Sequence, residues 1–168
     1  MQKSNLKAPS RKIKVIPKLM HFFFNLKMRL IYLVGGRIVG ARALIIKDQQ
    51  VLLIQHTYND LGWQTVGGGV NKNETAAQAI CREVEEEVGL KVEGKPKLFA
   101  VYYSNYHRRD DHIIFYIIDA FSIVKRPPSP EIEEMKWFDL QNLPENVSPA
   151  TKRRIDEFLG SLEISDRW

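Results

Sequence analysis

The stretch that decides the fold is Val66-Gly67-Gly68-Gly69-Val70-Asn71-Lys72-Asn73-Glu74, which is followed over residues 75–88 by a sequence with helical periodicity. Three consecutive glycines allow main-chain amides and carbonyls to approach a ligand closely just before the helix begins. Gly89 is expected to end the helix, because glycine adopts a left-handed backbone without steric cost. The stretch therefore predicts a ligand-facing loop joined to a helix.

The predicted helix gathers carboxylates on one side. At about 100° per residue, Glu86 and Glu87 lie within about 60° of Glu83, and Ile80 and Val84 form an apolar stripe beside them. Like charges three and four residues apart destabilise a helix unless a cation neutralises them. Carboxylate oxygens select Mg²⁺, Mn²⁺ or Ca²⁺ rather than zinc. A solvated acidic face is the alternative, and the adjoining glycine loop favours the metal site.

The loop and the helix together form one complete motif. From Gly68, five residues lead to Glu74, and seven more lead to Arg82-Glu83-Val84-Glu85-Glu86-Glu87-Val88-Gly89-Leu90. This arrangement matches the Nudix box, G-x5-E-x7-R-E-U-x-E-E-x-G-U with U aliphatic, at every specified position, so the chain resembles the Nudix hydrolase family. The resemblance extends less specifically over residues 39–159. It implies an α+β fold, a Nudix-type α/β/α sandwich with a mixed β-sheet and the catalytic loop and helix at its centre.

The remaining sequence predicts strands before and after this helix. The expected elements are a hairpin of 42–46 and 51–55, a Gly-rich loop at 63–70, a strand pair of 97–104 and 112–123, a short strand at 136–138 and a closing helix at 149–159. Ser148 is expected to cap the closing helix, with Pro149 at its first position, where the missing amide is harmless.

Composition is that of an ordinary globular protein. The 168 residues are 44% hydrophobic and 27% charged, which excludes collagen-like, coiled-coil and wholly disordered chains. The single cysteine, Cys81, excludes an internal disulfide and a Cys-rich zinc site, which favours a reducing compartment such as the cytoplasm. We expect neither a membrane span nor a secretory signal, because charged residues interrupt every apolar run of sufficient length.

Charge is distributed unevenly along the chain. Residues 1–47 contain eleven Lys and Arg and no Asp or Glu, whereas the remainder contains 14 basic and 20 acidic residues. We expect residues 1–38 to form a basic, partly apolar, helical extension of a domain at 39–168. Such an arm can be solvated, lie against its own domain, or contact an anionic membrane or RNA. The apolar residues within 16–34 are also compatible with a homodimer.

The family resemblance implies roles by matched position. The reaction would be hydrolysis of the pyrophosphate in a nucleotide-type substrate, a nucleoside diphosphate linked to a moiety X, with Mg²⁺ or Mn²⁺ as cofactor. The metal ligands would be Glu83, Glu86 and Glu87, together with the carbonyl of Gly67. Glu83 or Glu86, or a glutamate from a later loop, would be the general base. Arg82 would orient a carboxylate by a charge-assisted hydrogen bond.

Other glutamates have both a functional and a structural interpretation. Glu74 is expected in the first turn of the helix, where a carboxylate suits the helix dipole and can cap amides, a simpler explanation than metal ligation. Glu131 and Glu134, with Glu133 between them, are candidates for an extra ligand or the base if their loop reaches the metal site. A solvated acidic loop explains the three residues equally well.

The candidates for substrate contact are Trp63, Gly67, Gly68, Tyr103, Arg108 and Arg109. The glycines let the backbone approach, the aromatic rings could stack on a base, and the arginines could clamp phosphates. An aromatic residue on a strand more often belongs to the core, and the arginines also suit a polar turn.

Three classes of function compete. The first is a catalytic Nudix hydrolase, the second a nucleotide-binding or regulatory Nudix module without turnover, and the third a membrane-surface or RNA-associated protein that uses the basic arm. Every glutamate of the box is present, which favours the first class. ADP-ribose, nucleotide sugars, dinucleoside polyphosphates, oxidised nucleoside triphosphates and capped RNA are all compatible with X.

Overall fold

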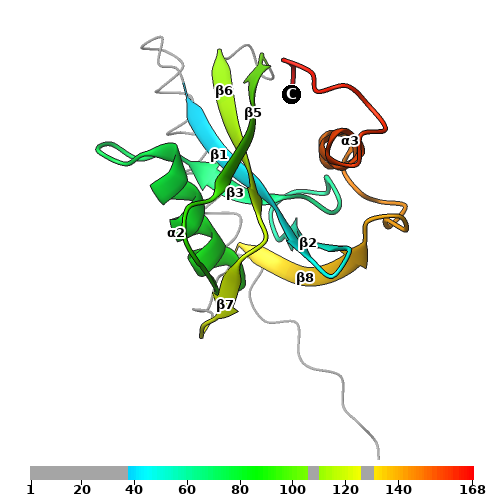
Figure 1. The fold of residues 1–168 in the computed structure, drawn as a ribbon, viewed down its shortest axis with the longest axis horizontal. Helices are drawn as coiled ribbons and strands as arrows, with labels where there is room; N and C mark the ends of the chain where they lie inside the picture. The colour runs from blue at the N-terminus through cyan, green and yellow to red at the C-terminus, as the bar shows by residue number, and fades with distance from the viewer. Residues whose placement is uncertain (1–37, 106–109, 126–130) are drawn as a thin grey trace, which may run out of the picture.

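The computed structural model describes residues 38–105, 110–125 and 131–168 (Figure 1). The expectations for the N-terminal extension, namely a helical arm, contact with a membrane or RNA, and a homodimer face, concern residues outside these ranges. Arg108 and Arg109 also lie outside the described residues. Within the described ranges, no helix combines the length and the hydropathy that crossing a membrane requires.

Strands form most of the regular structure in the described ranges. In chain order, the elements are β1 (Val39–Lys47), β2 (Gln50–His56), β3 (Val66–Gly69), α2 (Ala76–Val88), β4 (Leu90–Val92), β5 (Lys97–Ser104), β6 (Asp111–Ile118), β7 (Phe121–Ile123), β8 (Ile132–Asp139) and α3 (Pro149–Phe158).

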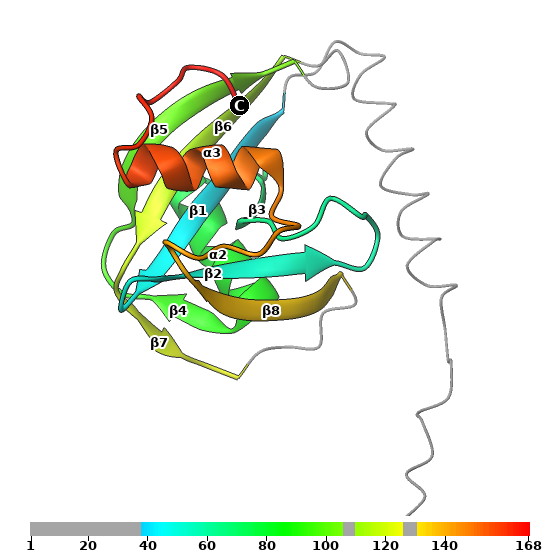
Figure 2. The same ribbon diagram turned by 90° about the vertical axis from the view of Figure 1, so that its right-hand side faces the viewer.

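A mixed sheet forms the centre of the fold. Its strand order is β5-β6-β1-β2-β8, and β3 pairs with the first half of β1. β1 and β6 run parallel, whereas the other pairs in this sheet are antiparallel. β4 and β7 form a separate two-stranded sheet. The helices α2 and α3 lie on opposite sides of the mixed sheet (Figures 1 and 2), in agreement with the expected α/β/α sandwich.

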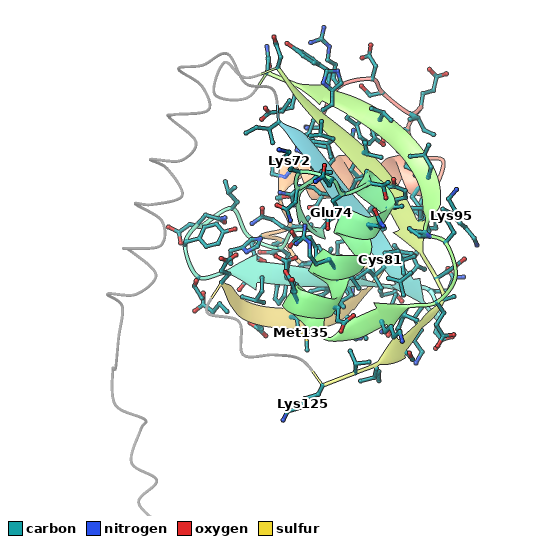
Figure 3. All side chains as sticks on the ribbon, turned by 90° about the vertical axis from the view of Figure 1, so that its left-hand side faces the viewer. Lys72, Glu74, Cys81, Lys95, Lys125 and Met135 are labelled. Carbon is teal, nitrogen blue, oxygen red and sulfur yellow. The ribbon has the colours of Figure 1, made fainter. Side chains whose placement is uncertain are left out.

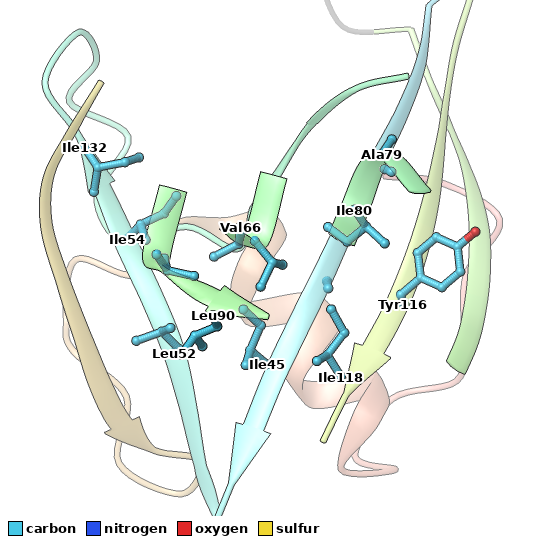
Figure 4. Close-up of a cluster of buried hydrophobic side chains, with 14 residues drawn as sticks. Ile45, Leu52, Ile54, Val66, Ala79, Ile80, Leu90, Tyr116, Ile118 and Ile132 are labelled. Atoms are coloured by element: carbon cyan, nitrogen blue, oxygen red, sulfur yellow. The ribbon is translucent and has the colours of Figure 1, made fainter. Parts of the chain in front are cut away.

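Each face of the mixed sheet has its own hydrophobic core. Ala43 and Ile45 of β1 belong to the core that includes Ile80 of α2 (Figure 4), whereas Leu44 between them belongs to the core that includes Ile155 of α3. This alternation follows from the two-residue period of a strand. Burying a side chain of this size stabilises the fold by about 1.5–3 kcal/mol, so both helices are fixed to the sheet by apolar burial.

Several of the expected elements are confirmed. β1 and β2 form the expected hairpin, with bounds slightly longer than the sequence indicated. α3 begins after Ser148, whose hydroxyl accepts a hydrogen bond from the Thr151 amide (3.2 Å), and Pro149 occupies its first turn.

Three expectations about strand boundaries are wrong. Residues 63–70 are not a loop throughout, because Val66–Gly69 forms β3 by main-chain pairing with β1. The strand expected at 112–123 is divided into β6 and β7. The last strand spans Ile132–Asp139 rather than 136–138 alone, because it pairs with β2 over most of its length. Each difference arises from pairing with a distant strand, which local residue preferences do not reveal.

The C-terminal residues return to the edge of the sheet at β5 (Figure 2). The Tyr103 amide donates to the Asp166 carbonyl (2.8 Å), and the Trp168 amide donates to the Tyr103 carbonyl (2.9 Å). A buried ion pair between Arg154 and Glu157 (2.6 Å) lies on α3 beneath this segment, and the Arg154 guanidinium lies 5.3 Å from the Trp168 ring centroid. Trp168 is therefore fixed by both its main chain and its ring.

Candidate functional site

The helix α2 begins and ends where its sequence predicts. The Thr75 hydroxyl accepts a hydrogen bond from the Gln78 amide (3.2 Å), and the Gln78 side chain accepts one from the Thr75 amide (2.9 Å). Gly89 ends the helix in the left-handed conformation, with a φ of 67°. Glu74 precedes this cap, so its expected place in the first helical turn is wrong. Figure 3 looks onto α2 and shows Glu74 near its beginning.

Arg82 connects the glycine loop to the acidic side of α2. Its guanidinium donates to Glu74 Oε1 (2.8 Å) and Oε2 (3.1 Å) and to the Gly69 carbonyl (3.1 Å). It also donates to Glu83 Oε1 (2.6 Å) and Glu86 Oε2 (3.3 Å). A guanidinium has five donors in a rigid fork, so one side chain can orient several carboxylates at once.

Glu74 is held on both carboxylate oxygens. The hydrogen bonds from Arg82 and from the Asn71 amide (2.9 Å) lower the pKa of Glu74 to about 2. Both oxygens of Glu74 are therefore engaged by Arg82 and the Asn71 amide.

Glu87 is the most buried carboxylate of the helix. Its side chain comes from the last turn of α2, the residue is 7% exposed, and its Oε2 accepts a hydrogen bond from the Gly67 amide (3.1 Å). Burial, assisted by the negative charges of Glu83 and Glu131, raises its pKa to about 8 against the opposing effects of the Gly67 amide and Arg42. The negative charges of Glu83 and Glu131 thus favour the protonated form of Glu87.

The glycines of β3 lie where side chains would not fit. Gly67 has a φ of 146°, and a Cβ there would collide with the Ala41 carbonyl of β1. A Cβ at Gly68 would collide with the carboxylate of Glu83. At Gly69, by contrast, a Cβ would meet open space. Gly67 is therefore required for close approach of the loop to β1, whereas a side chain at Gly68 would displace the Glu83 carboxylate.

The other glutamates of α2 differ in exposure. Glu83 is half-buried, and burial raises its pKa against the opposing effect of Arg82. The Glu86 side chain is 57% exposed, and Glu85 is exposed as well. The carboxylates on this side of the helix therefore run from a buried end at Glu87 to a solvent-facing end at Glu86.

Glu131 lies within electrostatic reach of the carboxylates of α2. Its charge raises the pKa of both Glu83 and Glu87, which places it within electrostatic reach of them. Glu133 and Glu134 are exposed residues within β8, so the expectation that they belong to a loop is wrong. β8 begins at Ile132 because pairing with β2 extends there, so Glu131 precedes the strand.

Two residues beside this cluster, His56 and Tyr58, were not expected from the sequence. His56, at the end of β2, is 5% exposed, and burial together with the charge of Arg42 lowers its pKa to about 4. Tyr58, which is 39% exposed, stacks on His56 with a centroid separation of 4.8 Å, and partial desolvation with the charges of Glu131 and Glu87 raises its pKa. No local pattern marks these residues, because folding alone brings them to the carboxylates.

The aromatic candidates for substrate contact lie elsewhere. Trp63 is 6% exposed and packs edge-on against Phe138 at 4.7 Å in the core beneath α3, which is a structural position. Tyr103 lies on the edge strand β5, where its hydroxyl donates to Asp110 Oδ1 (2.8 Å) and Arg167 lies over its ring at 4.9 Å.

The donor set of the cluster suits a hard divalent cation. Within the described ranges, no three His, Cys, Asp or Glu side chains are gathered closely enough to hold a metal as they stand. Arg82 and the Gly67 amide each engage an oxygen of a box glutamate. The glutamates nevertheless raise one another's pKa, and a divalent cation would relieve this repulsion through oxygen ligands of the type that Mg²⁺ prefers.

Comparison with known proteins agrees with this geometry. The sequence model of the NUDIX domain matches residues 36–158. An ADP-ribose pyrophosphatase of Methanocaldococcus jannaschii is 33% identical over 110 residues, which cover 63% of this chain and 64% of that protein. An NAD-capped RNA hydrolase, NudC, of Vibrio vulnificus is 31% identical over 115 residues, covering 64% of this chain but 41% of that protein. The chain thus spans less than two thirds of the length of these two relatives.

Solved structures show the same fold. The crystal structure of a MutT NUDIX hydrolase from Burkholderia pseudomallei superposes with a TM-score of 0.64 and 28% identity, covering 72% of this chain and 97% of the other. Fold, box and family match all lead to one assignment. This chain belongs to the Nudix hydrolase family.

Proposed function

We propose that this enzyme hydrolyses the pyrophosphate of a nucleoside diphosphate linked to a moiety X, with Mg²⁺ as its cofactor and Mn²⁺ as a substitute. The observation that carries the proposal is the buried carboxylate of Glu87, which accepts from the Gly67 amide and lies within electrostatic reach of Glu83 and Glu131. Burying an ionised carboxylate costs free energy unless its charge is neutralised. A divalent cation, which the family resemblance implies, would neutralise it.

Glu83, Glu86 and Glu87, with the Gly67 carbonyl, would hold the cation. When bound, it offsets the charge of the phosphates and lowers the pKa of a bound water. Arg82 keeps the glutamates in place, since its guanidinium bonds to both Glu83 and Glu86. Arg82 is a positioning residue in this scheme.

The general base is one of three glutamates. Glu83 and Glu86 share the guanidinium of Arg82, and Glu131 approaches from the entrance of β8. The base accepts the proton of the attacking water, so it must be ionised and reachable by solvent in the free enzyme. Glu134 is a weaker candidate than Glu131, because it lies within β8 opposite Gln55.

Adenosine diphosphate compounds are the first substrates to test. Two relatives are named for ADP-ribose and for NAD-capped RNA, and both of these compounds contain ADP joined to a further ribose. We propose ADP joined to a further ribose as the substrate class. X is then the group that contains this second ribose.

A substrate panel tests the proposal. Purified protein is assayed for release of AMP and other nucleotides from ADP-ribose, NAD, a nucleotide sugar, a dinucleoside polyphosphate, an oxidised nucleoside triphosphate and capped RNA, with Mg²⁺ and then Mn²⁺. We expect turnover of at least one ADP compound that stops in excess EDTA and returns with added metal. Turnover that persists in EDTA would contradict the metal requirement. Tight nucleotide binding without any turnover would support the non-catalytic module instead.

A further inference from the structure

Arg42 lies beside the glycine loop, on the opposite side from α2. It is the register partner of Gly67 in the pairing of β1 with β3, and its Cγ lies 2.8 Å from where a Cβ on Gly67 would be. Its Nη1 donates to the Thr65 carbonyl (3.2 Å). The stem of Arg42 is therefore packed against the same residue whose amide binds Glu87.

The charge of Arg42 is not neutralised by a carboxylate. Among the described residues, Arg42 takes part in no ion pair, and the undescribed residues contain no Asp or Glu. Its charge still reaches the site, since it lowers the pKa of both His56 and Glu87. Arg82 differs in this respect, because three glutamates surround its guanidinium.

Trp168 lies against the guanidinium of Arg42. The Arg42 Cζ is 5.9 Å from the Trp168 ring centroid, within the range of a cation–π contact. The Trp168 ring also contacts Tyr102 at 5.6 Å and Phe115 at 5.8 Å, both of which belong to the core of the sheet. The half-buried Arg42 therefore has an indole on one side at cation–π distance.

We propose that Arg42 binds a phosphate group of the substrate next to the Glu87 end of the site, and that Trp168 positions its guanidinium for this contact. This inference rests on the proposed function for the identity of the substrate. A half-buried cation without a carboxylate partner is costly, and guanidinium groups bind phosphate through charge-assisted, bidentate hydrogen bonds. Nη1 of Arg42 donates to the Thr65 carbonyl, and the other nitrogens of the guanidinium can donate to a phosphate.

Direct binding tests the role of Arg42. Wild type, Arg42→Gln and Arg42→Lys are titrated by calorimetry with α,β-methylene-ADP, which contains an uncleavable phosphate linkage, at saturating Mg²⁺. Arg153→Gln, which changes an exposed arginine of α3, is the matched control. We expect the Kd to rise about tenfold or more for Arg42→Gln, equivalent to about 1.4 kcal/mol per tenfold, and to rise less for Arg42→Lys. The control should bind as wild type does.

Kinetics with an active panel substrate separate the role of Arg42 from that of Glu87. We expect Arg42→Gln to raise the KM at saturating Mg²⁺ more than it lowers kcat. If excess Mg²⁺ restores the wild-type KM, Arg42 acts only through Glu87 and the proposal is wrong. It is also wrong if wild type and a folded Arg42→Gln bind the analogue equally or if neither binds it. Failure of the proposed function alone would appear as analogue binding that depends on Arg42 without turnover of any panel substrate.

Trp168 is tested by rescue. Trp168→Phe keeps an aromatic face beside Arg42, whereas Trp168→Leu keeps only apolar bulk. We expect the Kd for the analogue to stay near the wild-type value with Phe and to rise with Leu, at similar thermal stability. Equal affinities for the Phe and Leu variants would overturn the positioning role of the indole.

Discussion

Replacing Glu87 by Gln removes one buried negative charge and keeps the size of the side chain. In the metal-free protein the pKa of Glu87 is raised from 4.5 to about 8, chiefly by burial. At about 1.4 kcal/mol per pKa unit, ionisation of Glu87 destabilises the folded protein by at most about 5 kcal/mol. Glutamine has no charge to bury, and its side-chain oxygen can still accept from the Gly67 amide.

The effect on stability has a defined pH window. Below pH 4.5, Glu87 is protonated in both the folded and the unfolded protein, so ionisation contributes nothing. Between pH 4.5 and about 8 the unfolded chain gives up its proton first, and wild type loses stability relative to Glu87→Gln. Urea unfolding in EDTA should therefore show an advantage of the variant that grows by up to about 5 kcal/mol between about pH 4 and pH 9.

Activity should change in the opposite direction. Loss of a metal position or a general base typically costs about 10²-fold or more, so we expect that loss in kcat/KM for Glu87→Gln. Glu85→Gln is the matched control, because Glu85 is an exposed residue of the same helix. Two results would refute the reasoning. One is a stability difference that does not vary with pH, and the other is an equal loss of activity in Glu85→Gln.

Three further predictions concern the glycine loop, Glu74 and the N-terminal arm. Gly68→Ala should lower kcat about tenfold or more, because the added methyl group displaces the Glu83 carboxylate. Gly69→Ala should retain activity, because a Cβ there meets open space. Equal kcat values for the two variants would contradict this prediction. Glu74→Gln should lower kcat less than Glu87→Gln does, since Glu74 acts through Arg82, and steady-state kinetics on both variants decide the order. A truncated protein of residues 39–168 should unfold cooperatively in a thermal melt, and an insoluble product would show that the arm belongs to the core.

Local sequence was sufficient for the helix of the site. Thr75, Gln78 and Gly89 cap α2 through contacts within a few residues, and the 3.6-residue period places Glu83, Glu86 and Glu87 on adjacent faces. The family box also depends on spacing along one segment. These features are predictable because the interactions that produce them are short-range.

Longer-range features escaped the sequence because they depend on strand pairing. The sequence predicts a loop at the glycines of β3, because nothing in their own segment indicates that β1 supplies their hydrogen-bond partners. The same pairing brings Arg42 beside Gly67. Pairing of β8 with β2 likewise separates Glu131 from Glu134, although the two are close in sequence.

By itself, the sequence determined the helix, its end at Gly89, the acidic stripe and the family to which the chain belongs. Only the tertiary structure decided which carboxylate of that stripe is buried and what surrounds it. Helical periodicity places Glu86 and Glu87 symmetrically about Glu83, but the glycine loop covers Glu87 and leaves Glu86 in solvent. Desolvation depends on the atoms that other segments place around a group, and for that reason no local pattern could predict the raised pKa of Glu87.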